Sequence, residues 1–428
     1  MNLTWYDFAF YGAFIVVLLT YALSVHTYFI GRVSSLFLFR NASVLYYILF
    51  SVLLGKMVYE GTLLRSAHFN VHMYYLMLYY GIVLIGVAAL FNMQRPTHDI
   101  EVRPSRINIV PLLLILLLKA LLFLIDPTPM QELFVHGFAA AHLKQVVWHQ
   151  PGGGGLVMPI YTFLSPVMCI VFIVYFQRTR NLLFRLALLP LLFETSGFFF
   201  SKSGLIVPLI VLLIISGARL RTLGLAIVIG VFGVFAVRIG TENLVTADLA
   251  RAIGERFVDE TGYANPQLEL YEAKHPPLGY ATRYYIGFNS LFGIEPAVDA
   301  SRLAYVNETG KDTGATTSGH AAVSLYAFWG PAFYVILPVL LVFIFYLDAI
   351  VVRRISTSYE LTAYIFVAMK CVNYLTVDIQ RLIDFATIFD LTFITAVVAV
   401  WFVGKLLQLR IFSAPISFFG TRTAPGTA

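Results

Sequence analysis

Charged residues are scarce in this chain. Only 12% of its 428 residues are Asp, Glu, Lys or Arg, whereas 59% are hydrophobic. A soluble globular protein carries about twice that share of charge. A surface with so few charges cannot be solvated by water alone, so lipid must cover most of it. The composition therefore excludes the soluble fold classes.

Cysteine is also rare, and common catalytic motifs are missing. Cys169 and Cys371 both lie inside apolar segments, which is typical neither of a disulfide framework nor of a metal site. The sequence has no Gly-rich phosphate loop, no His-Glu-x-x-His and no Gly-x-Ser-x-Gly segment. These absences argue against nucleotide-binding proteins, zinc proteases and serine hydrolases. They also leave no clustered set of metal ligands, so we expect no cofactor.

What the sequence does have is a series of long apolar runs. Most reach the ~17–25 residues that a helix needs to cross the hydrocarbon core of a membrane. They predict an all-α polytopic membrane protein with about eleven transmembrane helices, forming a single integral membrane domain over residues 1–428. The short run at 204–217 could instead form a re-entrant hairpin with the run before it. The expected spans are residues 10–30, 44–64, 73–93, 107–126, 157–177, 182–200, 204–217, 222–238, 321–347, 361–377 and 385–404.

Basic residues are distributed unevenly between the predicted loops. The short loops of one side hold four, whereas alternate loops on the other side hold fifteen. Positive residues stay in the cytoplasm, so we expect the N-terminus outside and the C-terminus inside. Residues 239–320 and 127–156 then form one large and one smaller extracytoplasmic loop. The fifteen basic residues fall within residues 32–40, 95–106, 178–185, 219–221, 353–354 and 405–422.

Four cations are predicted on the outward side, at the depth of the membrane surface. Lys202 lies at a turn between two spans, and Arg238 lies where a span enters the large loop. Arg283 lies in an aromatic stretch of that loop, and Arg381 comes from a short outward loop. Together these side chains would suit an anionic lipid headgroup, especially a pyrophosphate. The alternative is that they are unrelated interfacial charges.

His320 directly precedes the apolar run 321–347. It should therefore lie near the N-terminal turn of that helix, on the outward side of the membrane. That position disfavours a cation and keeps the imidazole neutral, which is the form that a general base requires. Asp378 is the rival base. It forms an i, i+3, i+6 pattern with Arg381 and Asp384, which suits a salt bridge as well as a site.

The sequence resembles the Wzy-type O-antigen and oligosaccharide repeat-unit polymerases and, more distantly, the O-antigen ligases. The layout of spans with one large, late outward loop carries this resemblance. So do Ser201-Lys202-Ser203-Gly204 at the start of an apolar run, and Thr317-Ser318-Gly319-His320-Ala321-Ala322 leading into a late span. Arg251 and Gly262 also fit an Arg-x10-Gly spacing described for some of these polymerases.

The resemblance implies a metal-independent glycosyltransferase of the GT-C type in the bacterial cytoplasmic (inner) membrane. It would polymerise undecaprenyl-pyrophosphate-linked oligosaccharide repeat units, using lipid-linked glycans as donor and acceptor and a chain-length regulator protein as partner. The four cations would hold the departing pyrophosphate, and His320 or Asp378 would act on the acceptor hydroxyl. Membrane lipid is an expected partner and nucleic acid is not. Two alternatives stay open, an O-antigen ligase and a secondary transporter of an anionic solute.

Overall fold

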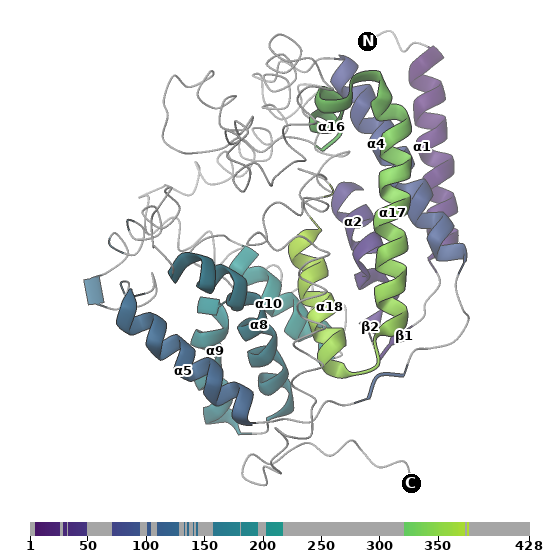
Figure 1. Ribbon diagram of the computed structural model, residues 1–428. Helices are drawn as coiled ribbons and strands as arrows, with labels where there is room; N and C mark the ends of the chain where they lie inside the picture. The colour runs from purple at the N-terminus through teal and green to yellow at the C-terminus, as the bar shows by residue number, and fades with distance from the viewer. Residues whose placement is uncertain are drawn as a thin grey trace, which may run out of the picture.

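The computed structural model describes slightly less than half of the chain, and that part is mostly helical (Figure 1). The described residues are 5–25, 29–31, 33–48, 71–94, 101–103, 109–127, 157–179, 181–195, 203–216 and 321–372, with the single positions 132, 135, 136, 140, 143 and 375. The longer elements are α1 (Trp5–Ser24), α2 (Phe39–Tyr47), α4 (Val71–Met93), α5 (Ile109–Ile125), α8 (Val157–Arg178), α9 (Leu182–Thr195), α10 (Ser203–Ile215), α16 (Ala321–Trp329), α17 (Phe333–Arg354) and α18 (Ser358–Cys371). The short ones are strands β1 (Phe29–Ile30) and β2 (Val33–Ser34) and 3-10 turns η1 (Ser35–Phe37) and η3 (Gly330–Ala332).

Five of the predicted spans correspond closely to observed helices, because a long apolar run satisfies all its backbone hydrogen bonds within itself only as a helix. They are the spans at 73–93, 107–126, 157–177, 182–200 and 204–217, which are α4, α5, α8, α9 and α10. Helix α18 begins three residues before the expected span at 361–377. The expected spans at 222–238 and 385–404 lie outside the described residues.

The first predicted span is wrong in its bounds. The helix covers Trp5–Ser24 rather than residues 10–30, because the chain then turns through the antiparallel pair β1–β2. Gly31 joins these strands with a φ of 51° and packs so closely that a Cβ would lie 2.8 Å from Val102 Cβ. Only glycine combines that backbone angle with that approach.

The predicted span at 321–347 is also wrong as a single helix. It consists of α16 and α17, separated by the turn η3. Gly330 has a φ of 55°, and Pro331 follows it. The left-handed residue ends α16, and proline is well suited to the first turn of the next helix because it lacks the N–H that would be unpaired there. Figure 1 shows α16 set at an angle on one end of α17.

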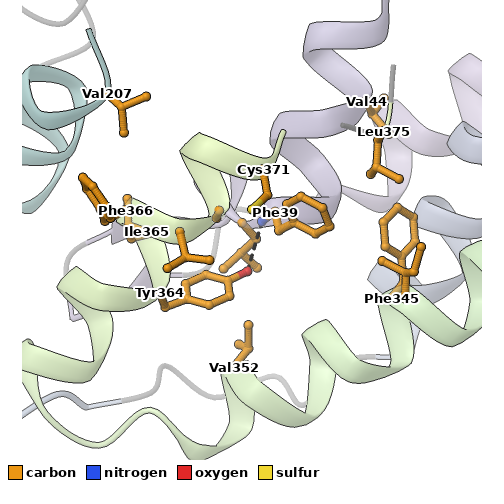
Figure 2. Packing of buried hydrophobic residues seen from close by; sticks show 14 of the residues in the cluster. Phe39, Val44, Val207, Phe345, Val352, Tyr364, Ile365, Phe366, Cys371 and Leu375 are labelled. Carbon is orange, nitrogen blue, oxygen red and sulfur yellow. Dashed lines mark hydrogen bonds between the residues drawn. The ribbon is translucent and has the colours of Figure 1, made fainter. Parts of the chain in front are cut away.

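The helices pack in two groups that share α18. Helices α1, α2, α16 and α17 all pack against α4, while α5, α9 and α10 pack against α8. Helix α18 contacts α2 on one side and α8 and α10 on the other. Figure 2 shows this junction, where Phe39, Tyr364 and Phe345 approach one another from α2, α18 and α17.

Helices α1, α4 and α17 run in the same direction, as contacts at both ends show. At one end the rings of Phe10 and Tyr75 lie 5.2 Å apart, and those of Tyr79 and Tyr334 lie 5.0 Å apart. We call this end, where α1, α4 and α17 begin, the α16 end. At the opposite end, called the α2 end, the Arg103 N–H donates to the Ser356 carbonyl over 2.9 Å.

Apolar side chains remain exposed along several helices. On α17, Val335, Val339 and Phe343 are exposed in one stripe, while Leu337 and Leu341 on another face are fully buried. A stripe of exposed valine and phenylalanine is unfavourable in water and favourable in lipid. Two helical stretches, Tyr75–Met93 and Gly330–Arg354, are long and apolar enough to cross a membrane.

Candidate functional site

The six residues that the sequence predicts for the site all lie outside the described part of the chain. Their mutual distances are untested, so the base and the pyrophosphate cluster stay predictions. These residues are His320, Asp378, Lys202, Arg238, Arg283 and Arg381.

The structure does describe the helices that two of them adjoin. The described part of α16 begins at Ala321, directly after His320, and that of α10 begins at Ser203, directly after Lys202. Ala321 and Ala322, the first described residues of α16, are fully buried. Whether the helix begins before or after His320 lies outside the described residues, so the placement of His320 at a helix N-terminus stays a prediction.

Aromatic side chains gather around the corner between α16 and α17. Tyr79 of α4, Tyr326 of α16, and Phe333 and Tyr334 of α17 form what we call the α16-end aromatic cluster. The ring centroids of Tyr79 and Phe333 lie 5.7 Å apart, those of Tyr326 and Phe333 6.0 Å, and those of Tyr326 and Tyr334 6.5 Å. All three pairs meet edge to face, the arrangement that aromatic quadrupoles prefer.

One hydrogen bond in this cluster has a clear origin in the sequence. The Tyr79 hydroxyl donates to the Tyr334 carbonyl over 2.7 Å. In a regular helix that carbonyl would accept from residue 338, but Pro338 has no N–H to donate. Tyr79 therefore supplies the donor that proline removes, and it ties α4 to the first turn of α17.

The aromatic cluster is accessible as well as ordered. Tyr334 is 42% exposed, and Tyr79 and Tyr326 are half-buried. Exposed tyrosine rings with fixed orientations can stack on sugar rings and offer hydroxyls to sugar oxygens, and they also suit the membrane–water interface. The α16 end is thus a partly open aromatic surface beside the start of the helix that follows His320.

A second polar centre, which the sequence analysis missed, lies at the α2 end. Arg40 and Asp348 are 3% and 0% exposed, and the Arg40 Nη1 donates to Asp348 Oδ2 over 2.9 Å. The other carboxylate oxygen accepts from the Tyr364 hydroxyl over 2.5 Å. The same hydroxyl accepts the Phe39 N–H over 3.0 Å, as the dashed line in Figure 2 marks.

The network continues from Arg40 into α1 and α4. Arg40 Nε donates to Asn92 Oδ1 over 3.1 Å, and Asn92 Nδ2 donates to Asn41 Oδ1 over 2.9 Å. The Tyr21 hydroxyl also donates to Asn41 Oδ1, over 3.3 Å. We call these four residues, together with Asp348 and Tyr364, the Arg40–Asp348 network. It joins five helices and satisfies a charge pair that would be costly in an apolar interior if left unpaired.

This network shows that the predicted location of Arg40 is wrong. Arg40 was expected in a basic cytoplasmic loop, but it is a buried residue of α2. Asp348 lies just beyond the expected end of the 321–347 run and within α17. An acid in so apolar a helix requires a cation or donors inside the bundle. That requirement could have marked Asp348, although nothing local would have identified Arg40 as its partner.

The described part of the chain contains no candidate metal centre. No group of three or more His, Cys, Asp or Glu side chains there is placed to hold a metal ion. His136 Nδ1 lies 2.8 Å from Glu132 Oε2 in the predicted smaller loop, one helical turn away and 62% exposed. Comparison of the chain with protein-family models, curated proteins and solved structures gave no match.

Proposed function

We propose that this protein is a glycosyltransferase that polymerises undecaprenyl-pyrophosphate-linked oligosaccharide repeat units on the outer side of the bacterial cytoplasmic membrane. The observation that carries the proposal is the arrangement of α16, α17 and the tyrosines at the α16 end. A buried helix includes the residues that follow His320 and turns at Gly330–Pro331 into α17, beside a partly exposed cluster of tyrosines. A polymerase needs a base for a sugar hydroxyl and a surface for sugar rings within reach of the membrane.

The proposed architecture is a GT-C-like bundle of about eleven transmembrane helices, with the α16 end facing outward. The two membrane-length helices, the exposed apolar stripes and the uneven distribution of basic residues support it. Arg103, Arg353 and Arg354 all lie at the α2 end, since Arg103 pairs with the segment that follows α17. That end would face the cytoplasm.

The proposed chemistry needs no metal. Lys202, Arg238, Arg283 and Arg381 would hold the pyrophosphate as it leaves the donor sugar, because cationic donors stabilise the charge that develops on its oxygens. His320 would accept the proton of the acceptor hydroxyl as the new glycosidic bond forms. A positioned base of this kind contributes about 10²–10⁴-fold to the rate. Asp378 is the alternative base.

The test is polymerisation by purified protein in lipid vesicles, supplied with a lipid-linked repeat unit and excess chelator. A ladder of lipid-linked products should form. His320→Ala should lower the rate by about 10²–10⁴-fold, whereas His136→Ala, at an exposed histidine, should leave it unchanged. If His320→Ala retains normal activity and Asp378→Asn abolishes it, the base is the carboxylate. If no variant and no condition gives glycan transfer, the proposal fails.

The two alternatives separate in the same assay. A ligase would transfer the glycan to a lipid A-core acceptor and form no ladder. A secondary transporter would form neither product, and it would need a buried charge that changes partners during transport. Both carboxylate oxygens of Asp348 accept from protein donors, Arg40 and Tyr364, which favours a fixed structural role for that buried pair.

A further inference from the structure

Arg178 and Arg185 both belong to the region where α8 ends and α9 begins. Arg178 ends α8, and the Arg185 Nε donates to the carbonyl of the next residue, Thr179, over 2.8 Å. The Arg185 guanidinium also lies 5.6 Å from the centre of the Phe176 ring. These contacts bring both cations to the same turn, which we call the α8–α9 turn.

Neither cation has an acidic partner in the described residues. The sequence offers almost none locally, since Glu194 is the only Asp or Glu between residues 157 and 195. A partly buried cation without a counter-charge is costly, and a bound anion would offset that cost. The α8–α9 turn is therefore a local concentration of positive charge that the described part of the chain does not neutralise.

Several buried polar atoms at the end of α8 also lack hydrogen-bond partners within the described part of the structure. They include Gln177 Oε1, Arg178 Nε and Thr179 Oγ1, and the Thr179 side chain is almost fully buried, at 1% exposure. Buried donors without partners are rare in folded proteins and often mark the place of a ligand or an ion. The Arg178 guanidinium, the Thr179 hydroxyl and the Arg185 guanidinium all carry hydrogen-bond donors of the kind that bind phosphate oxygens.

The surface next to these cations is apolar. Leu182, Leu183 and Leu186 of α9 are 66%, 77% and 52% exposed. Asn181 lies in the chain between Arg178 and the exposed leucines. It caps α9, since its Oδ1 accepts from the N–H groups of Leu183 and Phe184. Cations directly beside exposed leucines are the arrangement found where a helix crosses from headgroups into hydrocarbon.

We propose that the α8–α9 turn is a binding site for an anionic phospholipid. Arg178, Arg185 and Thr179 contact the phosphate, and the acyl chains lie along the three leucines. The exposed leucines favour a lipid over free phosphate, because a soluble anion would leave them uncovered. This site is not the proposed catalytic one. Tyr175 of the last turn of α8 interacts electrostatically with Tyr359 at the start of α18, which places the lipid at the α2 end, away from the α16 end.

The test measures lipid binding by the full-length protein with native mass spectrometry and with thermal unfolding in mixed micelles. The probes are phosphatidylglycerol, phosphatidylcholine and inorganic phosphate. Phosphatidylglycerol should bind the wild-type protein and raise its unfolding temperature, and phosphatidylcholine should do so much less. Arg178→Gln/Arg185→Gln should weaken phosphatidylglycerol binding about tenfold or more, since each charge-assisted hydrogen bond contributes roughly that factor.

The matched control is Arg353→Gln/Arg354→Gln, which removes the same charge from an exposed arginine pair at the end of α17. It should change binding by less than about twofold. Thr179→Val tests the hydroxyl with little change of shape and should weaken binding severalfold, even if the double variant does not fold. Equal losses in both arginine pairs, no loss with Thr179→Val, or equal protection by inorganic phosphate would each overturn the proposal.

Discussion

Arg40→Met should destabilise the protein more than any surface substitution, because it leaves Asp348 buried without its cation. The arginine donates to Asp348 and to Asn92, and a methionine of similar length replaces neither bond. Asp348 keeps only the Tyr364 hydroxyl as a described donor. Removing one member of a buried ion pair costs about 3–5 kcal/mol. Asp348→Leu should cost a similar amount, since it leaves a buried guanidinium.

The double variant distinguishes this explanation from simple loss of packing. If the two sites were independent, Arg40→Met/Asp348→Leu would cost the sum, about 6–10 kcal/mol. With the pair coupled, removing both charges leaves, among the described contacts, the Tyr364 hydroxyl and the Asn92 amide short of a partner, at about 1–3 kcal/mol for each group. The double variant should therefore lose clearly less stability than the sum of the two single losses.

The assay is reversible unfolding in mixed micelles, followed by the fluorescence of the four tryptophans. Arg40→Lys provides an intermediate point, because an ammonium reaches one acceptor where the guanidinium reaches two. A double variant that loses the full sum of the two single losses would refute the argument. So would an Arg40→Met protein within about 1 kcal/mol of the wild type, since that pair would then not be buried as an ion pair.

Three further predictions concern packing, a helix and orientation. Gly81→Ala should cost about 1–3 kcal/mol in unfolding experiments, because its Cβ would lie 2.5 Å from Tyr47 Cε1, whereas Gly86→Ala, with 3.7 Å to Val17, should be neutral. Tyr79→Phe should cost about 1 kcal/mol by unpairing the Tyr334 carbonyl, and much less in a Pro338→Ala background, where the new N–H can donate instead; equal losses in both backgrounds would contradict this. A cysteine at position 302 should react with an impermeant reagent from outside the cell, and one at position 353 should not; the reverse pattern would invert the proposed orientation.

The helices were predictable from sequence because each follows from its own residues. The run at 157–177 is predominantly apolar and carries no charge, so its own residues predict α8. The break at Gly330 was missed because a hydropathy pattern contains no backbone angle, and Gly330–Pro331 leaves the run almost as apolar as before. The boundary at Ser24 moved for the same reason, since the short β1–β2 turn follows it.

The features of the candidate sites also differ in whether they depend on neighbouring residues or on distant helices. A helix over the apolar residues that follow His320 is local information, and it was predictable. The burial of Arg40 is not local, because it depends on an aspartate in a distant helix. The aromatic cluster lies between these cases, since tyrosines are evident in the sequence but only the packing of α4 on α16 and α17 gathers them.

The separation of Arg40 from Asp348 along the chain has a consequence for biosynthesis. The two residues are 308 positions apart, so α2 leaves the ribosome long before its counter-ion exists. An unpaired arginine at that depth is costly in a bilayer, so α2 cannot settle into its final position while the middle of the chain is still being made. Insertion of α17 then supplies Asp348 and completes the group of helices that packs around α4. A chain truncated before α17 should accordingly be recognised as unfinished and degraded, although most of its predicted spans are present.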